Sequence, residues 1–126
     1  MIVGLGVDIV EIERMESALD RYPRLKERLF TPSEREYCDS HARPFVHYAL
    51  RFAAKEAVSK VLGTGMRGLR WQDIEVVRDG KGKPFPVLTG SAASAAEALG
   101  IGTVYLSLSY THQSAVASAI AVQKNE

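Results

Sequence analysis

The chain has 126 residues, of which 46% are hydrophobic and 25% charged, which is typical of a globular protein and excludes a mainly disordered one. Sixteen Lys and Arg against fifteen Asp and Glu leave a formal charge of +1, so no overall field favours nucleic acid. The single cysteine permits no internal disulfide, and no apolar run approaches the ~18 residues of a membrane span. We therefore expect one cytoplasmic domain over residues 1–126, with neither a nucleic-acid nor a membrane partner.

Apolar spacing and helix-breaking residues divide the chain into helices and strands. Runs rich in β-branched residues, or alternating with polar ones, predict strands, and apolar residues at helical spacing predict helices. In chain order, the patterns predict a strand over 1–10, helices over 11–19, 23–30 and from Pro32, a long helix over 44–62, strands over 73–78 and 85–88, a helix from Gly90 to Gly100, and strands over 104–110 and 115–122.

Punctuating residues support this division. Thr31 and Glu34 around Pro32 have the pattern of a capping box, Gly63 suits the end of the long helix, and Thr89 is expected to cap the helix that follows it. The order strand, helices, hairpin, helix, hairpin favours an α+β fold with a mainly antiparallel sheet.

The stretch from Arg51 to Lys60 is the most informative part of the chain. In a helix, Phe52, Glu56 and Lys60 recur every four residues and share one face. An apolar anchor beside a surface Glu–Lys pair explains this spacing as well as a functional site does. Asp8, a carboxylate in an apolar strand, could likewise be a strand-end residue or a helix cap. If two such carboxylates met, a hard cation such as Mg²⁺ would relieve their repulsion, and a lysine nearby would suit a phosphate.

Several separated motifs follow one another along the chain. They are Val3-Gly4-Leu5-Gly6-Val7-Asp8-Ile9 with Glu13-Arg14, then Arg51-Phe52-Ala53-Ala54-Lys55-Glu56-Ala57 with Lys60 and Gly63-Thr64-Gly65, then Trp71-Gln72-Asp73-Ile74-Glu75-Val76, Gly82-Lys83-Pro84 and Ser107-Leu108-Ser109. In this order they resemble the holo-[acyl-carrier-protein] synthases. The resemblance covers essentially the whole chain and is far more specific than any one motif.

The resemblance implies a 4′-phosphopantetheinyl transferase fold, in which a mainly antiparallel sheet packs against a long central helix. Family members move the phosphopantetheine arm of coenzyme A onto a serine of apo acyl-carrier protein, in fatty acid biosynthesis, and release adenosine 3′,5′-bisphosphate. By position, Asp8 and Glu56 would ligate Mg²⁺ and Lys60 would neutralise charge growing on the pyrophosphate. Small members are trimers, so we expect a homotrimer with coenzyme A bound between subunits.

The resemblance also suggests further contacts to coenzyme A. The candidates are Arg51, Lys60, Gly63, Thr64, Gly65, Lys83, Pro84 and Tyr110. A solvated arginine, a helix stop and a hairpin turn explain several of them equally well. The family usually has a histidine where this chain has Tyr110, and on a strand His112 would share the face of Tyr110. A phosphate contact at this position is therefore in question.

The serine nucleophile also needs a proton acceptor. Glu56 could accept the proton directly or through water, and Glu34 is a weaker candidate because the capping box already explains it. His41, His47 and Cys38 lack a supporting motif and are expected to be structural or solvent-facing.

Arginines near the first two helices are candidates for docking the acidic carrier protein, as the resemblance implies. Arg14, Arg21 and Arg28 recur every seven residues and Arg24 lies between them, although Pro23 is expected to divide the row between two helices. An ordinary solvated face is the alternative explanation. Two other functions fit part of the pattern: a binding module for an acidic carrier, which would not need Asp8 and Glu56, and a Mg²⁺-dependent phosphohydrolase.

Overall fold

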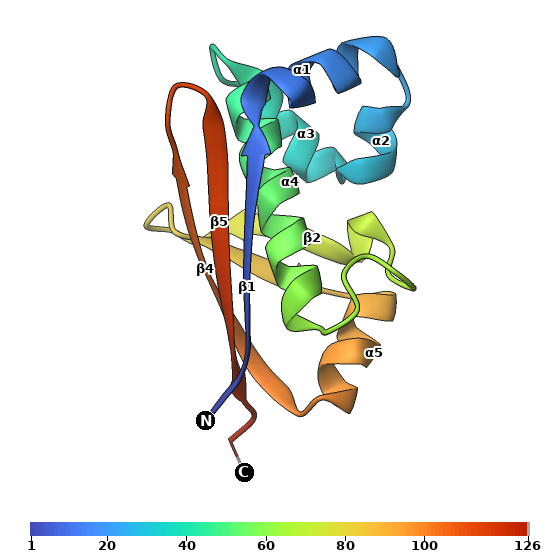
Figure 1. The fold of residues 1–126 in the computed structure, drawn as a ribbon, viewed down its shortest axis with the longest axis vertical. Helices are drawn as coiled ribbons and strands as arrows, with labels where there is room; N and C mark the ends of the chain where they lie inside the picture. Colours follow the sequence, from blue (N-terminus) through green and yellow to red (C-terminus); the bar gives the residue numbers. More distant parts are fainter. Residues whose placement is uncertain (126) are drawn as a thin grey trace.

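The computed structural model describes residues 1–125 and has the expected α+β architecture (Figure 1). In chain order the elements are β1 (Ile2–Glu11), α1 (Ile12–Arg21), α2 (Leu25–Leu29), α3 (Pro32–Asp39), α4 (Pro44–Val61), the short 3-10 helix η1 (Trp71–Asp73), β2 (Ile74–Arg78), β3 (Pro84–Leu88), α5 (Gly90–Ala98), β4 (Ile101–Tyr110) and β5 (Ser114–Gln123). All strand pairs are antiparallel, in a three-stranded sheet β1-β5-β4 and a two-stranded sheet β2-β3. The predicted fold class is confirmed.

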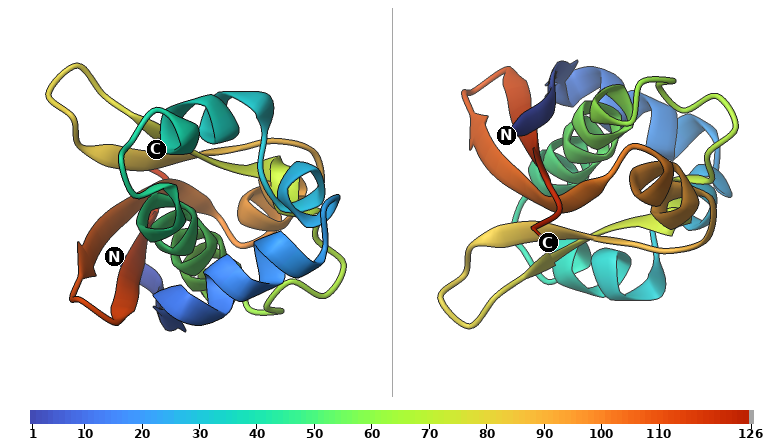
Figure 2. Two further views of the ribbon diagram at one scale, coloured as in Figure 1. Left: turned by 90° about the horizontal axis from the view of Figure 1, so that it is seen from above. Right: turned by 90° about the horizontal axis from the view of Figure 1, so that it is seen from below.

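Helix α4 is the centre of the molecule. Viewed end-on, it lies between the three-stranded sheet and the other elements, as Figure 2 shows. Helices α1, α2 and α3 gather at one end of the molecule and α5 lies at the other, where the two chain ends also meet (Figure 1). No helix within residues 1–125 is long and apolar enough to cross a membrane.

Strand β1 approaches α4 more closely than side chains would normally allow. A Cβ atom at Gly6 would stand 2.0 Å from the carbonyl oxygen of Ala57, and one at Gly4 would stand 3.2 Å from that of Val61. Glycine is therefore required at position 6, because any larger residue would push the strand and the helix apart. This close packing brings the residues on the inner face of β1 against α4.

The three-stranded sheet has two unlike faces. The face against α4 carries small residues from β5, and Ala115, Ala117, Ala119 and Ala121 are all buried there. The opposite face is apolar and uncovered: Leu5, Ile120 and Tyr105 lie side by side across the three strands and are 68%, 38% and 53% exposed. An apolar row of this kind on a sheet face indicates an association surface.

The helical end of the molecule follows the predicted boundaries with one shift. The capping box of Thr31 and Glu34 is confirmed, with both of its hydrogen bonds formed. Helix α2 begins at Leu25, so Pro23 lies in the turn before the helix and not at its first position.

Two local predictions were wrong. Thr89 forms no side-chain cap for α5, because the carboxylate of Asp73 accepts the hydrogen bonds from the backbone N–H and hydroxyl of Ser91 instead. His112 does not lie on a strand: β4 ends at Tyr110, and His112 lies in the exposed turn before β5.

Candidate active site

Three residues from β1 and α4 meet where the strand crosses the helix. The Lys60 ammonium lies 3.3 Å from Oδ1 of Asp8 and donates a 2.8 Å hydrogen bond to the carbonyl oxygen of Val7. Glu56 precedes Lys60 by one helical turn, on the same face of α4. Residues 52 positions apart in the chain are thus brought into contact.

The carboxylates of Asp8 and Glu56 influence one another. Burial raises the pKa of Glu56 above its usual range, the charge of Asp8 raises it further, and Lys60 acts in the opposite direction. One ammonium therefore faces two carboxylates, and the local formal charge is negative. Such an arrangement favours the arrival of a cation.

The donor set of this site suits Mg²⁺. Within the described part of the chain no group of three or more His, Cys, Asp or Glu side chains comes together. Mg²⁺ commonly takes only one or two carboxylates and completes its octahedron with phosphate oxygens and water. Asp8 and Glu56 supply that number of hard oxygen ligands.

The site opens into a groove of about 1430 Å³. Asp8 and Glu56 line it together with Arg14 of α1, Arg28 of α2 and His112 of the β4–β5 turn. Charged side chains of both signs line it, since Arg43 and the carboxylates of Glu11, Glu13 and Glu16 also belong to its wall.

An aromatic pair forms part of the same groove. The rings of Phe52 on α4 and Trp71 on η1 stack with centroids 5.0 Å apart and planes inclined by 21°. Phe52 lies one turn before Glu56 on α4, and both residues line the groove; Lys60 lies one turn further along the same helix face, as predicted.

The glycine-containing loop after α4 follows directly from Lys60. Gly63 has a φ of +88° and ends the helix as predicted. The Thr64 hydroxyl donates to the carbonyl of Gly65, and the loop is open to solvent or only partly covered. The Gly63 N–H donates to the carbonyl of Lys60, so the loop starts directly beside that residue.

Several residues predicted to contact coenzyme A or the carrier protein do not line this groove in a single chain. Lys83 and Pro84 line a separate cavity of about 730 Å³ between β3, α5 and β4. Tyr110, at the end of β4, is 57% exposed and is not among the residues lining the groove. The docking candidates Arg21 and Arg24 are also exposed outside it, on or next to the helices that carry Arg14 and Arg28.

Arg51 lies in neither cavity, and the interpretation of it as a solvated arginine is wrong. Its side chain is nearly fully buried, and the guanidinium carbon lies 4.0 Å from the centroid of the Tyr37 ring. Its Nε has no hydrogen-bond partner among residues 1–125, and Arg78 approaches the same ring. Tyr37 and Arg78 had no recognisable pattern in the sequence. A buried arginine without a carboxylate is a candidate for an anion ligand.

The weaker candidate for the general base is enclosed inside the protein. Glu34 is 1% exposed, and its Oε1 lies 2.8 Å from the ammonium of the fully buried Lys55. No role was predicted for Lys55 from the sequence, although its alanine neighbours in α4 are typical of a buried helix face.

Cys38, His41 and His47 have the placement expected of structural residues. Burial raises the pKa of Cys38 to about 12, and the rings of His41 and His47 lie against one another, with centroids 3.8 Å apart.

Comparison with known proteins gives a consistent result. Residues 4–117 match the family model of the 4′-phosphopantetheinyl transferase superfamily. A holo-[acyl-carrier-protein] synthase of Desulforudis audaxviator is 50% identical over 127 residues, covering 100% of this chain and 97% of the relative. The crystal structure of the Neisseria meningitidis holo-[acyl-carrier-protein] synthase superposes with a TM-score of 0.90 at 33% identity, covering 98% of this chain and 100% of that one. The Bacillus anthracis enzyme, solved in complex with coenzyme A (3′,5′-ADP), superposes with a TM-score of 0.79 at 37% identity, with 96% of both chains covered.

Proposed function

The chain belongs to the 4′-phosphopantetheinyl transferase superfamily, and on that premise we propose how its residues carry out the family reaction. The protein transfers the 4′-phosphopantetheine arm of coenzyme A to a serine of apo acyl-carrier protein, in fatty acid biosynthesis. The products are holo acyl-carrier protein and adenosine 3′,5′-bisphosphate. The contact of Lys60 with Asp8, beside a groove that Asp8 and Glu56 line together, is the observation that carries the proposed mechanism.

Asp8 and Glu56 would hold Mg²⁺ through their carboxylates. When bound, the ion would supply positive charge to the pyrophosphate of coenzyme A. Lys60 acts separately, since its ammonium, anchored by the carbonyl of Val7, stabilises the negative charge that grows on the departing phosphate. An interaction that strengthens as the bond breaks acts mainly on turnover, not on ground-state binding.

Glu56 is the better proposed acceptor for the proton of the carrier serine. Glu34 cannot serve, because its carboxylate is occupied by Lys55, the backbone N–H of Thr31 and that of Val76. Glu56 lines the groove where a carrier would present its serine, so its carboxylate could accept the proton directly or through a water.

The contacts to coenzyme A are proposed to come from two subunits of a homotrimer. The loop Gly63–Gly65 lies beside Lys60, whereas Lys83, Pro84 and Tyr110 lie away from the groove of their own chain. A second copy that packs against the uncovered apolar face of the three-stranded sheet would bring the two sets together. The buried Nε of Arg51, which has no hydrogen-bond partner among residues 1–125, supports a phosphate contact by this residue.

The carrier protein is proposed to dock along α1 and α2. Arg14 and Arg28 line the groove that contains Glu56, and Arg21 and Arg24 are exposed outside it. Opposite charge on an acidic carrier would speed its encounter and orient its serine toward Glu56.

A cytoplasmic location and a single domain complete the proposal. The lone cysteine is buried and unpaired, as in proteins of reducing compartments. Two hydrophobic clusters include the N-terminal and C-terminal halves of α4, and Val10 and Leu108 pack against both, which supports one continuous core.

Mixing the protein with apo acyl-carrier protein, coenzyme A and Mg²⁺ and weighing the carrier tests this function. We expect the serine of the carrier to gain one phosphopantetheine while adenosine 3′,5′-bisphosphate accumulates in equal amount. Free phosphopantetheine with an unmodified carrier would identify a phosphohydrolase instead. A stable complex without any reaction would identify a binding module.

A further inference from the structure

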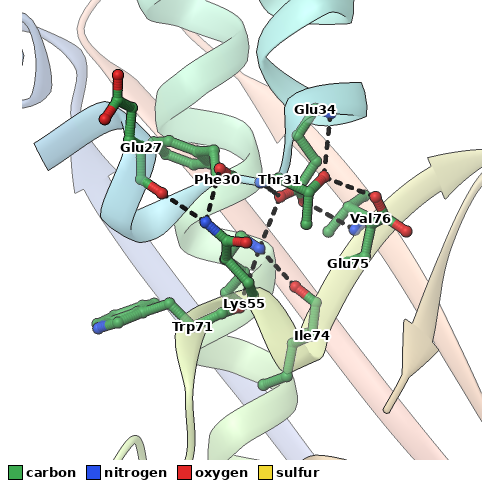
Figure 3. Close-up of polar contacts among 10 residues, drawn as sticks. Glu27, Phe30, Thr31, Glu34, Lys55, Trp71, Ile74, Glu75 and Val76 are labelled. Atoms are coloured by element: carbon green, nitrogen blue, oxygen red, sulfur yellow. Dashed lines mark hydrogen bonds and ion pairs between the residues drawn. The ribbon is translucent and has the colours of Figure 1, made fainter. Parts of the chain in front are cut away.

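The segment Trp71–Val76 lies between the docking helices and α4, and the proposed mechanism uses none of its side chains. Figure 3 shows that its polar contacts point in two directions. On one side the carbonyls of Trp71 and Ile74 accept hydrogen bonds from Lys55 of α4. On the other side Gln72 and Glu75 contact the α2–α3 region. The segment thus connects the α2–α3 region, where the carrier is proposed to dock, to α4, which carries the proposed metal ligand Glu56.

Gln72 fixes the end of α2. Its side-chain amide donates to the carbonyl of Glu27 at 2.5 Å and to that of Phe30 at 3.2 Å. These carbonyls belong to the last turn and the C-cap of α2, where backbone acceptors lack partners inside the helix. The turn held in this way carries Arg28 and Leu29, and both residues line the groove.

Lys55 fixes the other side of the segment. Its fully buried ammonium contacts Glu34 at 2.8 Å and donates to the carbonyls of Trp71 at 3.1 Å and Ile74 at 2.5 Å. All three of its protons therefore have acceptors. Because Lys55 immediately precedes Glu56 in α4, the same contacts also fix the turn of α4 that carries the proposed metal ligand.

Glu34 and Thr31, at the start of α3, connect that helix to β2. Glu34 accepts from the backbone N–H of Val76 in β2, and the Thr31 hydroxyl donates to Glu75 at 2.6 Å. A buried ion pair is a weak source of stability, since apolar residues of similar size often serve as well. The Lys55–Glu34 pair is better explained by its effect on geometry, because it fixes the positions of α2, α3 and α4 relative to one another.

We propose that Gln72 and the Lys55–Glu34 pair are positioning residues that set the spacing between the carrier-docking helix α2 and Glu56. A carrier held on α2 then presents its serine at the metal site. The inference rests on the proposed function and on docking of the carrier at α2. It concerns residues that do not line the groove of Asp8 and Glu56.

Gln72→Ala is the sharper test, because the side chain is exposed and its loss should leave the fold intact. We expect the KM for the carrier to rise about tenfold, with kcat and the KM for coenzyme A within about twofold of the parent. Gln123→Ala, which truncates another exposed glutamine at the far end of β5, is the matched control and should change neither KM. An unchanged carrier KM in Gln72→Ala, or equal increases in both KM values, would overturn the proposal.

A second pair of variants separates positioning from stability. Lys55→Met leaves Glu34 buried without its counter-charge and should lower the melting temperature, whereas Lys55→Met/Glu34→Gln should recover much of it. We expect the carrier KM of the double variant to stay raised although its stability has returned. Recovery of both quantities together would show a purely structural pair and overturn its positioning role. If the double variant does not fold, Gln72→Ala decides alone.

The proposed function and the positioning role fail in different ways. If the parent protein does not modify the carrier, the proposed function is wrong. If the parent is active and Gln72→Ala keeps a normal carrier KM, only the positioning role is wrong.

Discussion

The ammonium of Lys60 lies 3.3 Å from Oδ1 of Asp8, although one residue belongs to a helix and the other to a strand 52 positions earlier. The contact depends on Gly6, where a Cβ atom would stand 2.0 Å from the carbonyl oxygen of Ala57. A glycine with no chemical role thus determines whether the proposed site can form.

Gly6→Ala should therefore damage both folding and activity. Overpacking in a rigid contact of this kind costs about 1–3 kcal/mol, sometimes more, and the strand must move away from α4 to relieve it. We expect a lower urea midpoint and a loss of transfer activity larger than the loss of folded protein. The control is Gly80→Ala, since a Cβ atom there would meet nothing within 4 Å. Normal activity in Gly6→Ala would show that close packing of β1 on α4 is not needed.

Metal-free protein should become more stable when Glu56 loses its charge. Burial and the charge of Asp8 raise the folded-state pKa of Glu56, so the folded protein holds this proton more tightly than the unfolded chain. The associated stability is present at acid pH and is lost as the pH rises through the raised pKa. Glu56→Gln in chelator should thus melt above the parent at pH 8, with the difference shrinking toward pH 4. A lower melting temperature for Glu56→Gln at pH 8 would contradict this assignment.

Tyr110 should make a modest contribution to the use of coenzyme A. A phenol is neutral at pH 7 and offers one hydrogen bond, worth about 0.5–1.5 kcal/mol, so Tyr110→Phe should raise the KM for coenzyme A by about 2- to 10-fold. His112 lines the groove, whereas Tyr110 does not. A normal KM in Tyr110→Phe together with a raised one in His112→Ala would assign the contact to His112.

Reversing a charge on the proposed docking surface should change the KM for the carrier protein and leave the KM for coenzyme A nearly unchanged. Arg14→Glu places a negative charge on the groove wall, and we expect the KM for the carrier to rise sharply while that for coenzyme A stays nearly constant. The dependence of carrier KM on salt should also flatten, because charges on this surface are screened over about 8–10 Å. Steady-state kinetics at low and high salt measure both effects. Equal increases in the two KM values would remove Arg14 from the docking surface.

Local signals in the sequence predicted most of the fold. The capping box of Thr31 and Glu34 and the stop at Gly63 define helix ends through interactions between near neighbours, and both were predicted correctly. The cap of α5 was not, because its acceptor, Asp73, lies 18 residues away from Ser91. A contact at that separation leaves no local pattern.

In the candidate site, too, features set by near neighbours were predicted and contacts between distant residues were not. The spacing of Glu56 and Lys60 in α4 was sufficient to place them on one face, and a carboxylate in an apolar strand was sufficient to single out Asp8. Their contact could be anticipated only through the family resemblance. The partners of Lys55 and the burial of Arg51 were not foreseen, because each depends on elements that meet only in the folded chain.

The rate of carrier modification by Glu56→Gln tests the central claim most directly. The substitution preserves shape but removes one charged metal ligand, so at saturating Mg²⁺ the rate, followed by the mass of the carrier, should fall by at least about 100-fold. Glu36→Gln, which neutralises an exposed carboxylate on α3, should stay within about twofold of the parent. Chelator should abolish the activity of the parent and of Glu36→Gln, and Mg²⁺ should restore it. A folded Glu56→Gln protein that modifies the carrier at a rate near that of the parent would contradict the assignment of this site.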